Sequence, residues 1–172
     1  MAASLWSIRL AVSGDGAFLA DMLVEAVNWS SEWPKQSLKR VLSTHRTAHY
    51  IAGWPRDTDL GVIAEANGDR IGAAWLRFHP ASDPGYGFIA ADVPELTIGV
   101  VEDWRGRGVG RDLLRVIAEQ ALPAGIRQIS LSVERKNFAQ ELYRSEGYRI
   151  VDCSGKDSDT MLKDLVPPRA ST

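Results

Sequence analysis

Hydrophobic positions repeat along the chain with two periods, one typical of strands and one typical of helices. Seven segments have the strand pattern: Ser7–Val12, Leu60–Ala66, Arg70–Phe78, Leu96–Val101, Gln128–Val133, Tyr148–Val151 and Thr160–Leu165. Four segments have the helical pattern: Ala17–Val27, Lys35–Tyr50, Val109 to about Ala121, and Asn137 to about Glu146. Strands joined as hairpins come first and alternating strands and helices follow. This order predicts a mixed α/β sheet flanked by helices.

Three breaks between these segments add detail. Asn67-Gly68 separates two predicted strands and is a strong signal for a tight hairpin. Gly147 follows the last predicted helix, where glycine is the common residue just past a helix end. The stretch His79–Pro94 is rich in Gly, Pro and Asp, and a loop of that length inside a compact domain is often functional.

The composition is that of an ordinary globular domain. The chain has 172 residues, of which 45% are hydrophobic and 24% charged. Its net charge of −2 gives no basic excess to cover a phosphate backbone, so we expect no nucleic-acid binding. No apolar run approaches the roughly 18 residues of a membrane span, and no signal-peptide pattern is present. The single cysteine, Cys153, excludes internal disulfides and fits a reducing compartment, so we expect a cytoplasmic protein without membrane contact.

A glycine-rich turn, RGRGVG at residues 105–110, joins the strand Leu96–Val101 to the helix that follows it. Its glycines carry no Cβ, so backbone N–H groups there can approach a ligand closely. The first N–H groups of a helix lack an acceptor within the helix and carry partial positive charge. Full positive charge comes from Arg105, Arg107 and Arg111. The turn therefore predicts a site for a phosphate or pyrophosphate.

Two motifs together resemble those of one enzyme family. Residues 105–110 fit R/Q-x-x-G-x-G/A directly after a strand. Residues 137–143 (NFAQELY), followed by Gly147-Tyr148, fit N-x-A-x-x-L-Y-x-x-x-G-F/Y. Both lie on the predicted elements, and the element order fits from Ile8 to Leu165. The chain thus resembles the GNAT superfamily of acyl-CoA-dependent N-acyltransferases.

The resemblance implies a fold and an activity. The fold would be a mixed, mostly antiparallel sheet of about seven strands, flanked by about four helices and splayed between its fourth and fifth strands. Residues 1–166 would form a single N-acetyltransferase domain, and residues 167–172 a flexible C-terminal tail. The activity would move an acetyl group from acetyl-CoA to a primary amine of a small molecule or peptide, by direct attack through a tetrahedral intermediate. The alternative is an inactive acyl-CoA-binding regulatory module. A homodimer is possible.

The resemblance also implies which residues hold acetyl-CoA. The strand would pair its backbone with the pantetheine arm, and the turn would hold the pyrophosphate with backbone amides. The implied cofactor-binding residues are Ile98, Val100, Val101, Arg105, Gly106, Arg107, Gly108, Val109, Gly110, Arg111 and Asn137. Some relatives space the Asn and Tyr one residue further apart, and in that register Lys136 takes the place of Asn137. Arg107 and Arg115 have an alternative as partners of Glu102, Asp103 or Asp112 on a solvated face.

Two residues are candidates for proton transfer. A lysine-like amine has a pKa near about 10.4, so forming the neutral amine at pH 7 costs roughly 4–5 kcal/mol, and a base is needed. Glu95, at the start of the cofactor strand, is the candidate base, and its alternative is a solvated strand-end carboxylate. By the resemblance, Tyr143 is the acid that protonates the departing CoA thiolate. Its alternative is a core tyrosine.

The acceptor side is the least determined. Trp29 and Trp33 lie where relatives often line the acceptor, Trp54 and Trp75 could add aromatic walls, and core packing is the alternative for each. Acidic residues could attract a cationic amine: Glu32, Asp83 and Asp92. His45 and His49 lie one turn apart on a predicted helix, but HRTAH lacks the acidic residue of a zinc-protease motif. No third ligand is evident, so we expect no metal.

Overall fold

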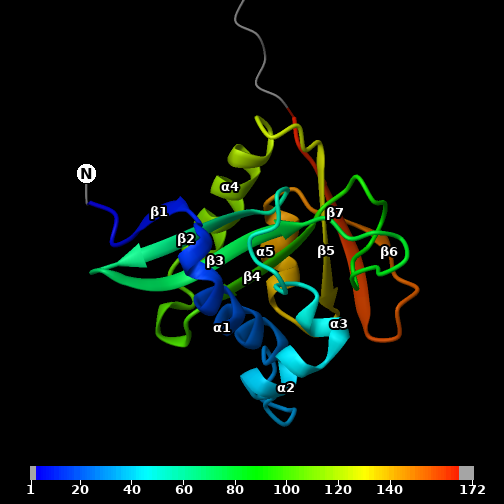
Figure 1. The fold of residues 1–172 in the computed structure, drawn as a ribbon, viewed down its shortest axis with the longest axis horizontal. Helices are drawn as coiled ribbons and strands as arrows, with labels where there is room; N and C mark the ends of the chain where they lie inside the picture. The colour runs from blue at the N-terminus through cyan, green and yellow to red at the C-terminus, as the bar shows by residue number, and fades with distance from the viewer. Residues whose placement is uncertain (1–2, 167–172) are drawn as a thin grey trace, which may run out of the picture.

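A seven-stranded sheet forms the centre of the computed structural model, which describes residues 3–166 (Figure 1). Its strands are β1 (Ser7–Leu10), β2 (Leu60–Ala66), β3 (Asp69–Arg77), β4 (Glu95–Val100), β5 (Gln128–Glu134), β6 (Arg149–Asp152) and β7 (Ser158–Asp164). Their order across the sheet is β1-β2-β3-β4-β5-β7-β6. β4 and β5 are parallel, and the other neighbouring strands are antiparallel. The predicted mixed, mostly antiparallel sheet is confirmed.

Helices cover both faces of this sheet: α1 (Gly16–Val27), α2 (Leu38–Ser43), α3 (His45–Ala48), α4 (Val109–Ala121) and α5 (Ala139–Ser145). Single 3₁₀ turns, η1 (Ser13–Asp15) and η2 (Glu102–Trp104), precede α1 and α4. None of the helices within residues 3–166 is long and apolar enough to cross a membrane.

Successive residues of the strands belong to two separate cores, because side chains alternate across a sheet. Trp75 of β3 packs in one core with Leu19 and Leu23 of α1. The next residue, Leu76, belongs to the other core with Leu113 of α4. The cores therefore place α1 on one face and α4 on the other, as Figure 1 shows.

The single helix predicted over Lys35–Tyr50 is wrong. The chain forms two short helices instead, α2 and α3, separated by Thr44 with an extended backbone (φ −97°, ψ 117°). The Thr44 hydroxyl donates to the carbonyl of Arg40 at 3.0 Å, a local bond that competes with continuation of the helix. The break carries Tyr50 beyond α3 and into the core, where it is buried.

Two glycine predictions are confirmed. Asn67 and Gly68 both have positive φ, 53° and 83°, as a type I′ hairpin turn requires. Gly147 has φ 95°, and the N–H of Tyr148 donates back to the carbonyl of Tyr143 at 3.0 Å, which closes the end of α5. The predicted tail, residues 167–172, lies outside the described residues.

Candidate active site

β4 has an edge without a strand partner over most of its length. Within the described chain, the only residues of β4 and β5 in register are Glu95 and Ser130, and the N–H of Ser130 donates to the carbonyl of Pro94 at 3.0 Å. The N–H of Val101 donates to Ile71 at 2.8 Å, toward β3. Since main-chain groups alternate in direction along a strand, those of Ile98 and Val100 point away from β3. The predicted splay between the fourth and fifth strands is therefore present, and it leaves main-chain groups of β4 without a strand partner.

The glycine-rich turn presents a run of free amides. The N–H groups of residues 106–111 donate to no acceptor within the part of the chain that the structure describes. Gly106 and Gly108 have φ of 72° and 99°, values that other residues rarely adopt. α4 then begins at Val109, and its first helical bond runs from Asp112 N–H to the carbonyl of Gly108 at 3.1 Å. Free amides at the N-terminus of a helix are a ready site for phosphate.

The arginines of this turn have different partners. Arg105 forms an ion pair with Glu25 of α1, and its Nε donates to the carbonyl of Val100 at 3.1 Å. Arg107 lies over the ring of Trp104, with 4.9 Å between the guanidinium carbon and the ring centroid. Among the described residues, Arg107 forms no ion pair. Its charge is therefore the least compensated of the turn.

The remaining arginines meet at one carboxylate. Arg111 and Arg115 both form ion pairs with Glu146 at the end of α5, at 3.1 Å for Arg115. The predicted alternative for Arg115, pairing with Glu102, Asp103 or Asp112, is not what the structure shows. Glu146 is buried, and the two guanidinium groups lower the pKa of its carboxyl against the effect of burial. These two ion pairs connect α4, which follows the glycine-rich turn, to the end of α5.

Glu95 is buried, with 3% of its surface exposed, so the alternative of a solvated carboxylate is wrong. Its Oε1 accepts from the hydroxyl of Tyr50 at 2.7 Å and from the N–H of Gly87 at 2.9 Å. Its Oε2 has no hydrogen-bond partner among the described residues. Burial raises the pKa of Glu95 to about 7, although the bonds from Tyr50 and Gly87 act in the opposite direction. A carboxyl of this kind can take up and release a proton at neutral pH.

The loop between β3 and β4 lies directly over this carboxyl. A Cβ added to Gly85 would come within 1.9 Å of Glu95 Oε2, and one added to Gly87 within 2.6 Å of the Leu131 carbonyl carbon in β5. Only glycine allows so close an approach at these positions. The sequence analysis found the loop but not this contact, nor the role of Tyr50. The sequence PGYG at residues 84–87 was the signal that could have indicated a close backbone approach.

Tyr143 lies on α5 and is almost fully buried, packed edge to face against Tyr148 with 5.9 Å between ring centroids. Burial raises the pKa of Tyr143 to about 12, so its hydroxyl keeps its proton at neutral pH. Burial alone accounts for this shift, and no hydrogen bond to another described residue contributes to it. Tyr143 is therefore part of the core, and its hydroxyl keeps a proton that is not shared with another described residue.

Asn137 lies just before α5. Its Oδ1 accepts from the N–H of Ala139, the first residue of α5, at 2.9 Å, although the N-cap position itself is Phe138. Its side-chain amide nitrogen donates to no acceptor among residues 3–166 and is free for a ligand. Nothing in the contacts assigns a similar place to Lys136.

The predicted aromatic walls separate into two groups. Trp29 and Trp33 pack edge to face, 5.5 Å apart, after α1. Trp29 also lines a small cavity of about 150 Å³ together with Lys35, Glu25 and Arg105, next to the glycine-rich turn. Trp75, in contrast, is fully buried and its Nε1 donates to the carbonyl of Tyr50 at 2.9 Å. Trp75 is a core residue and cannot line an acceptor site.

Comparison with known proteins identifies the family of this chain. Residues 23–148 match the acetyltransferase (GNAT) family. The chain belongs to this family. The matched region includes the free edge of β4, the glycine-rich turn and α5. The sequence-based assignment to GNAT is confirmed.

Named relatives are acetyltransferases. The chain is similar to the mycothiol acetyltransferase of Corynebacterium aurimucosum, 27% identical over 135 residues, which are 74% of this chain and 41% of that protein. It is also similar to an acetyltransferase of Pectobacterium atrosepticum, 29% identical over 98 residues, which are 56% of this chain and 62% of the relative. The match thus spans less than half the length of the mycothiol enzyme.

Solved structures share the fold. A Salmonella typhimurium protein assigned as an acetyltransferase, solved with its cofactor acetyl-CoA, has a TM-score of 0.65 at 21% identity, covering 97% of this chain and 98% of that one. An N-acetyltransferase of Thermoplasma acidophilum in complex with coenzyme A has a TM-score of 0.62 at 20% identity, covering 92% and 98%. The predicted GNAT-like fold is therefore confirmed, and these two proteins were solved with acetyl-CoA or CoA bound.

Proposed function

We propose that this GNAT chain transfers the acetyl group of acetyl-CoA to a primary amine of a small molecule or peptide. The observation that carries the proposal is the run of free amides at residues 106–111, directly after a strand with an unpaired edge. Acyl-CoA offers a matching pair of groups, an anionic pyrophosphate for the amides and an amide-containing arm for the strand edge. Relatives of this fold solved with acetyl-CoA or CoA support the same ligand.

The main chain would do most of the binding. Ile98 and Val100 would pair with the pantetheine arm, which requires Arg105 to give up its bond to the Val100 carbonyl. The amides of the turn would hold the pyrophosphate, and Arg107 would add positive charge. Bound acetyl-CoA supplies a thioester, which is an activated acyl donor. The protein's task is then to orient it and to move protons.

Glu95 is proposed as the general base. Because burial raises its pKa to about 7, the carboxylate and the acid are both populated at neutral pH. Tyr50 and Gly87 hold Oε1, which leaves Oε2 to receive a proton from the amine. Since Glu95 is only 3% exposed and Gly85 covers Oε2, we propose that the proton reaches the carboxylate through a water molecule.

Tyr143 is proposed as the general acid. Its hydroxyl is protonated at neutral pH, and no hydrogen bond from a described residue contributes to its pKa. A departing CoA thiolate next to this hydroxyl would be the base that accepts its proton. Proton donation to the sulfur would assist the release of CoA. The core packing of Tyr143 against Tyr148 is compatible with this role, because it fixes the ring without using the hydroxyl.

Release of the CoA thiol from acetyl-CoA, measured across a panel of amines, tests the proposal. The panel should include glucosamine-like amines, amino acids, polyamines and peptides with free N-termini or lysines. Amine-dependent thiol release with transfer of the acetyl group to nitrogen, shown by mass spectrometry, is the expected result. Tight acetyl-CoA binding without transfer to any amine would favour the inactive acyl-CoA-binding module instead.

A further inference from the structure

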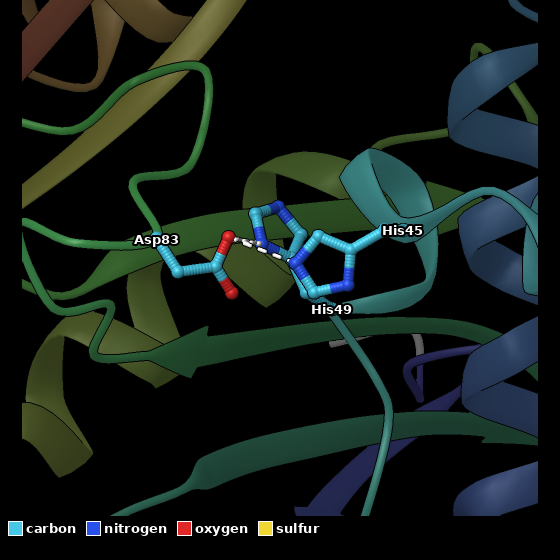
Figure 2. Close-up of side chains that lie close together, drawn as sticks. All are labelled: His45, His49 and Asp83. Atoms are coloured by element: carbon cyan, nitrogen blue, oxygen red, sulfur yellow. Dashed lines mark hydrogen bonds and ion pairs between the residues drawn. The ribbon is translucent and has the colours of Figure 1, made fainter.

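Two histidines at the ends of α3 and an aspartate of the loop between β3 and β4 lie close together (Figure 2). His45 begins α3 and His49 is the residue that ends it, so both rings lie on one face of this single turn. Asp83 comes from the loop between β3 and β4, 38 positions after His45. The sequence analysis found no third ligand for the histidine pair because loop folding, not spacing, brings Asp83 to it.

The donor atoms are close enough to share one ion. His45 Nε2 lies 2.9 Å from Asp83 Oδ1, and His49 Nδ1 lies 3.3 Å from the same oxygen. All three ligand atoms lie within 4.8 Å of one another. A tetrahedral zinc ion with ligands at about 2.0–2.1 Å separates neighbouring ligand atoms by about 3.3 Å. The cluster therefore needs only small side-chain movements to surround an ion.

We propose that His45, His49 and Asp83 form a binding site for a zinc ion. Two imidazole nitrogens and a carboxylate oxygen are a ligand set that zinc favours, with a water molecule in the fourth position. The side chain of His45 is 71% exposed, which gives an ion access from solvent. His49 is 5% exposed and packs against the rings of Tyr50 and His79, each 4.7 Å away between centroids, so one ligand is held in place by packing.

One outer contact of the cluster is missing. The second nitrogen of His49, Nε2, has no partner among the described residues. Because such outer partners strengthen a site, we expect moderate rather than very tight affinity.

A zinc ion here would tie the loop to α3. From Asp83 the same loop continues through Tyr86, whose N–H donates to the Tyr50 hydroxyl at 2.7 Å, and Gly87, which contacts Glu95. Occupancy of the site would therefore hold the segment that covers Glu95. In the absence of an ion, Asp83 is linked to the two rings by hydrogen bonds alone. This link between the loop and α3 is weaker and more easily broken than one through a bound ion.

Calorimetric titration of the tag-free protein with ZnCl₂ tests the site, with Co²⁺ absorption reporting the coordination geometry. The exposed thiol of Cys153 is a competing ligand, so every sample should carry Cys153→Ser. We expect one ion per chain and a tetrahedral Co²⁺ spectrum. Asp83→Ala and His45→Ala should each weaken zinc binding by about tenfold or more.

Asp92→Ala is the matched control, because Asp92 is an exposed aspartate on the same loop outside the cluster. It should bind zinc as the parent does. Equal zinc affinity in the Asp83→Ala and Asp92→Ala proteins, or no binding in the parent, would overturn the proposal. Neither outcome depends on acetyl transfer, so failure here leaves the proposed function untouched.

Hydrogen exchange tests the effect on the loop. Zinc should slow exchange of the Tyr86 and Gly87 amides in the parent by several-fold, and should have no such effect in Asp83→Ala. If zinc does not change these exchange rates in the parent, the ion does not stabilise the loop segment that covers Glu95. Mass spectrometry of peptides from residues 80–94 gives the required resolution.

Discussion

The two sides of the proposed active site are built in different ways. On the cofactor side, the main-chain groups of β4 and the amides of residues 106–111 belong to one continuous segment. On the acceptor side, Glu95 is surrounded by side chains and backbone from separate segments, Tyr50 after α3 and the loop at Gly85–Gly87. The first side depends on backbone conformation, and the second on side-chain packing and charge.

This difference predicts different responses to mutation. A backbone-built site tolerates side-chain changes and fails when a glycine can no longer adopt its conformation. A site built from buried side chains keeps its shape but loses protons, charge or hydrogen bonds when a single atom changes. Mutations that alter the cofactor side should therefore act on CoA affinity, and those on the acceptor side should act on turnover and its pH dependence.

Gly108→Val should have the largest effect, a loss of CoA affinity of at least about 10³-fold. Gly108 has φ 99°, which a β-branched residue rarely adopts, so the amides of the turn would be redirected. Loss of only three charge-assisted hydrogen bonds, at roughly 1.5 kcal/mol each, accounts for that factor. Calorimetric titration with CoA measures it, and thermal unfolding monitors the fold.

Gly125→Val is the matched control for backbone strain. Gly125 follows α4 with φ 83°, and the space around its Cβ position is open. The control should be destabilised to a similar degree and should still bind CoA. Equal losses of CoA affinity in both variants would show that strain anywhere in the domain suffices, which would remove the special role of the turn.

Glu95→Gln should lower turnover by about 10³-fold while leaving CoA affinity within a factor of two or so, since loss of a general base costs about 10²–10⁴. In the wild type, kcat/KM should fall as pH drops through about 7, because the carboxylate becomes protonated. Pre-steady-state thiol release and CoA titration separate the two effects. Wild-type turnover in the variant would exclude Glu95 as the base.

The stability of Glu95→Gln has a predictable sign. Burial raises the folded-state pKa of Glu95 from an ordinary 4.5 to about 7, so between these values the folded protein holds a proton that the unfolded chain releases. Ionisation of Glu95 therefore costs stability as pH rises through this range. Relative to wild type, the variant should gain about 2–3 kcal/mol in unfolding free energy between pH 5 and pH 8. Urea unfolding at the two pH values measures the gain.

Tyr143→Phe should lower turnover by about 10²-fold, with little change in acyl-CoA affinity, because it removes only the proton proposed for the thiolate. Tyr148→Phe is the matched control. The Tyr148 hydroxyl is buried without a partner among the described residues, so its removal should be neutral or stabilising and should leave turnover intact. Turnover in Tyr143→Phe equal to that in Tyr148→Phe would reduce Tyr143 to a core residue.

The backbone-built side could be predicted from sequence because its signals are local. Strand alternation and the RGRGVG turn are each contained within a few neighbouring residues, as is the Asn67-Gly68 hairpin between β2 and β3, and the structure has them where they were expected. The helix predicted over Lys35–Tyr50 is wrong because hydrophobic periodicity continues across Thr44, whereas the backbone breaks there. Hydrophobic periodicity does not reveal a single side-chain hydrogen bond that competes with the helix.

The acceptor side could be predicted only in part. Glu95 was a candidate from its position, but its burial and its raised pKa depend on Gly85 and Gly87 lying over it. The contact of Asp83 with the histidines, and on the cofactor side the pairing of Arg111 with Glu146, likewise join segments distant in sequence. Long-range packing of this kind leaves no periodic or motif signal, so the structure was needed to find it.

Tyr50→Phe addresses the residue that the sequence analysis missed, and it should have the smallest effect. The Tyr50 hydroxyl donates to Glu95 Oε1 at 2.7 Å and so favours the ionised carboxylate. Its loss should raise the pKa of Glu95 above about 7 and shift the acid limb of kcat/KM upward by about one pH unit, the equivalent of one hydrogen bond. Activity should fall several-fold at pH 7 and recover toward the wild-type value above pH 8.

Tyr86→Phe is the control, because Tyr86 stacks on Tyr50 and contributes only its backbone N–H to this network. A pH-independent loss of activity in Tyr50→Phe would mean that the tyrosine only supports the loop, whereas a shifted limb would show that a side chain from another segment positions and tunes the base.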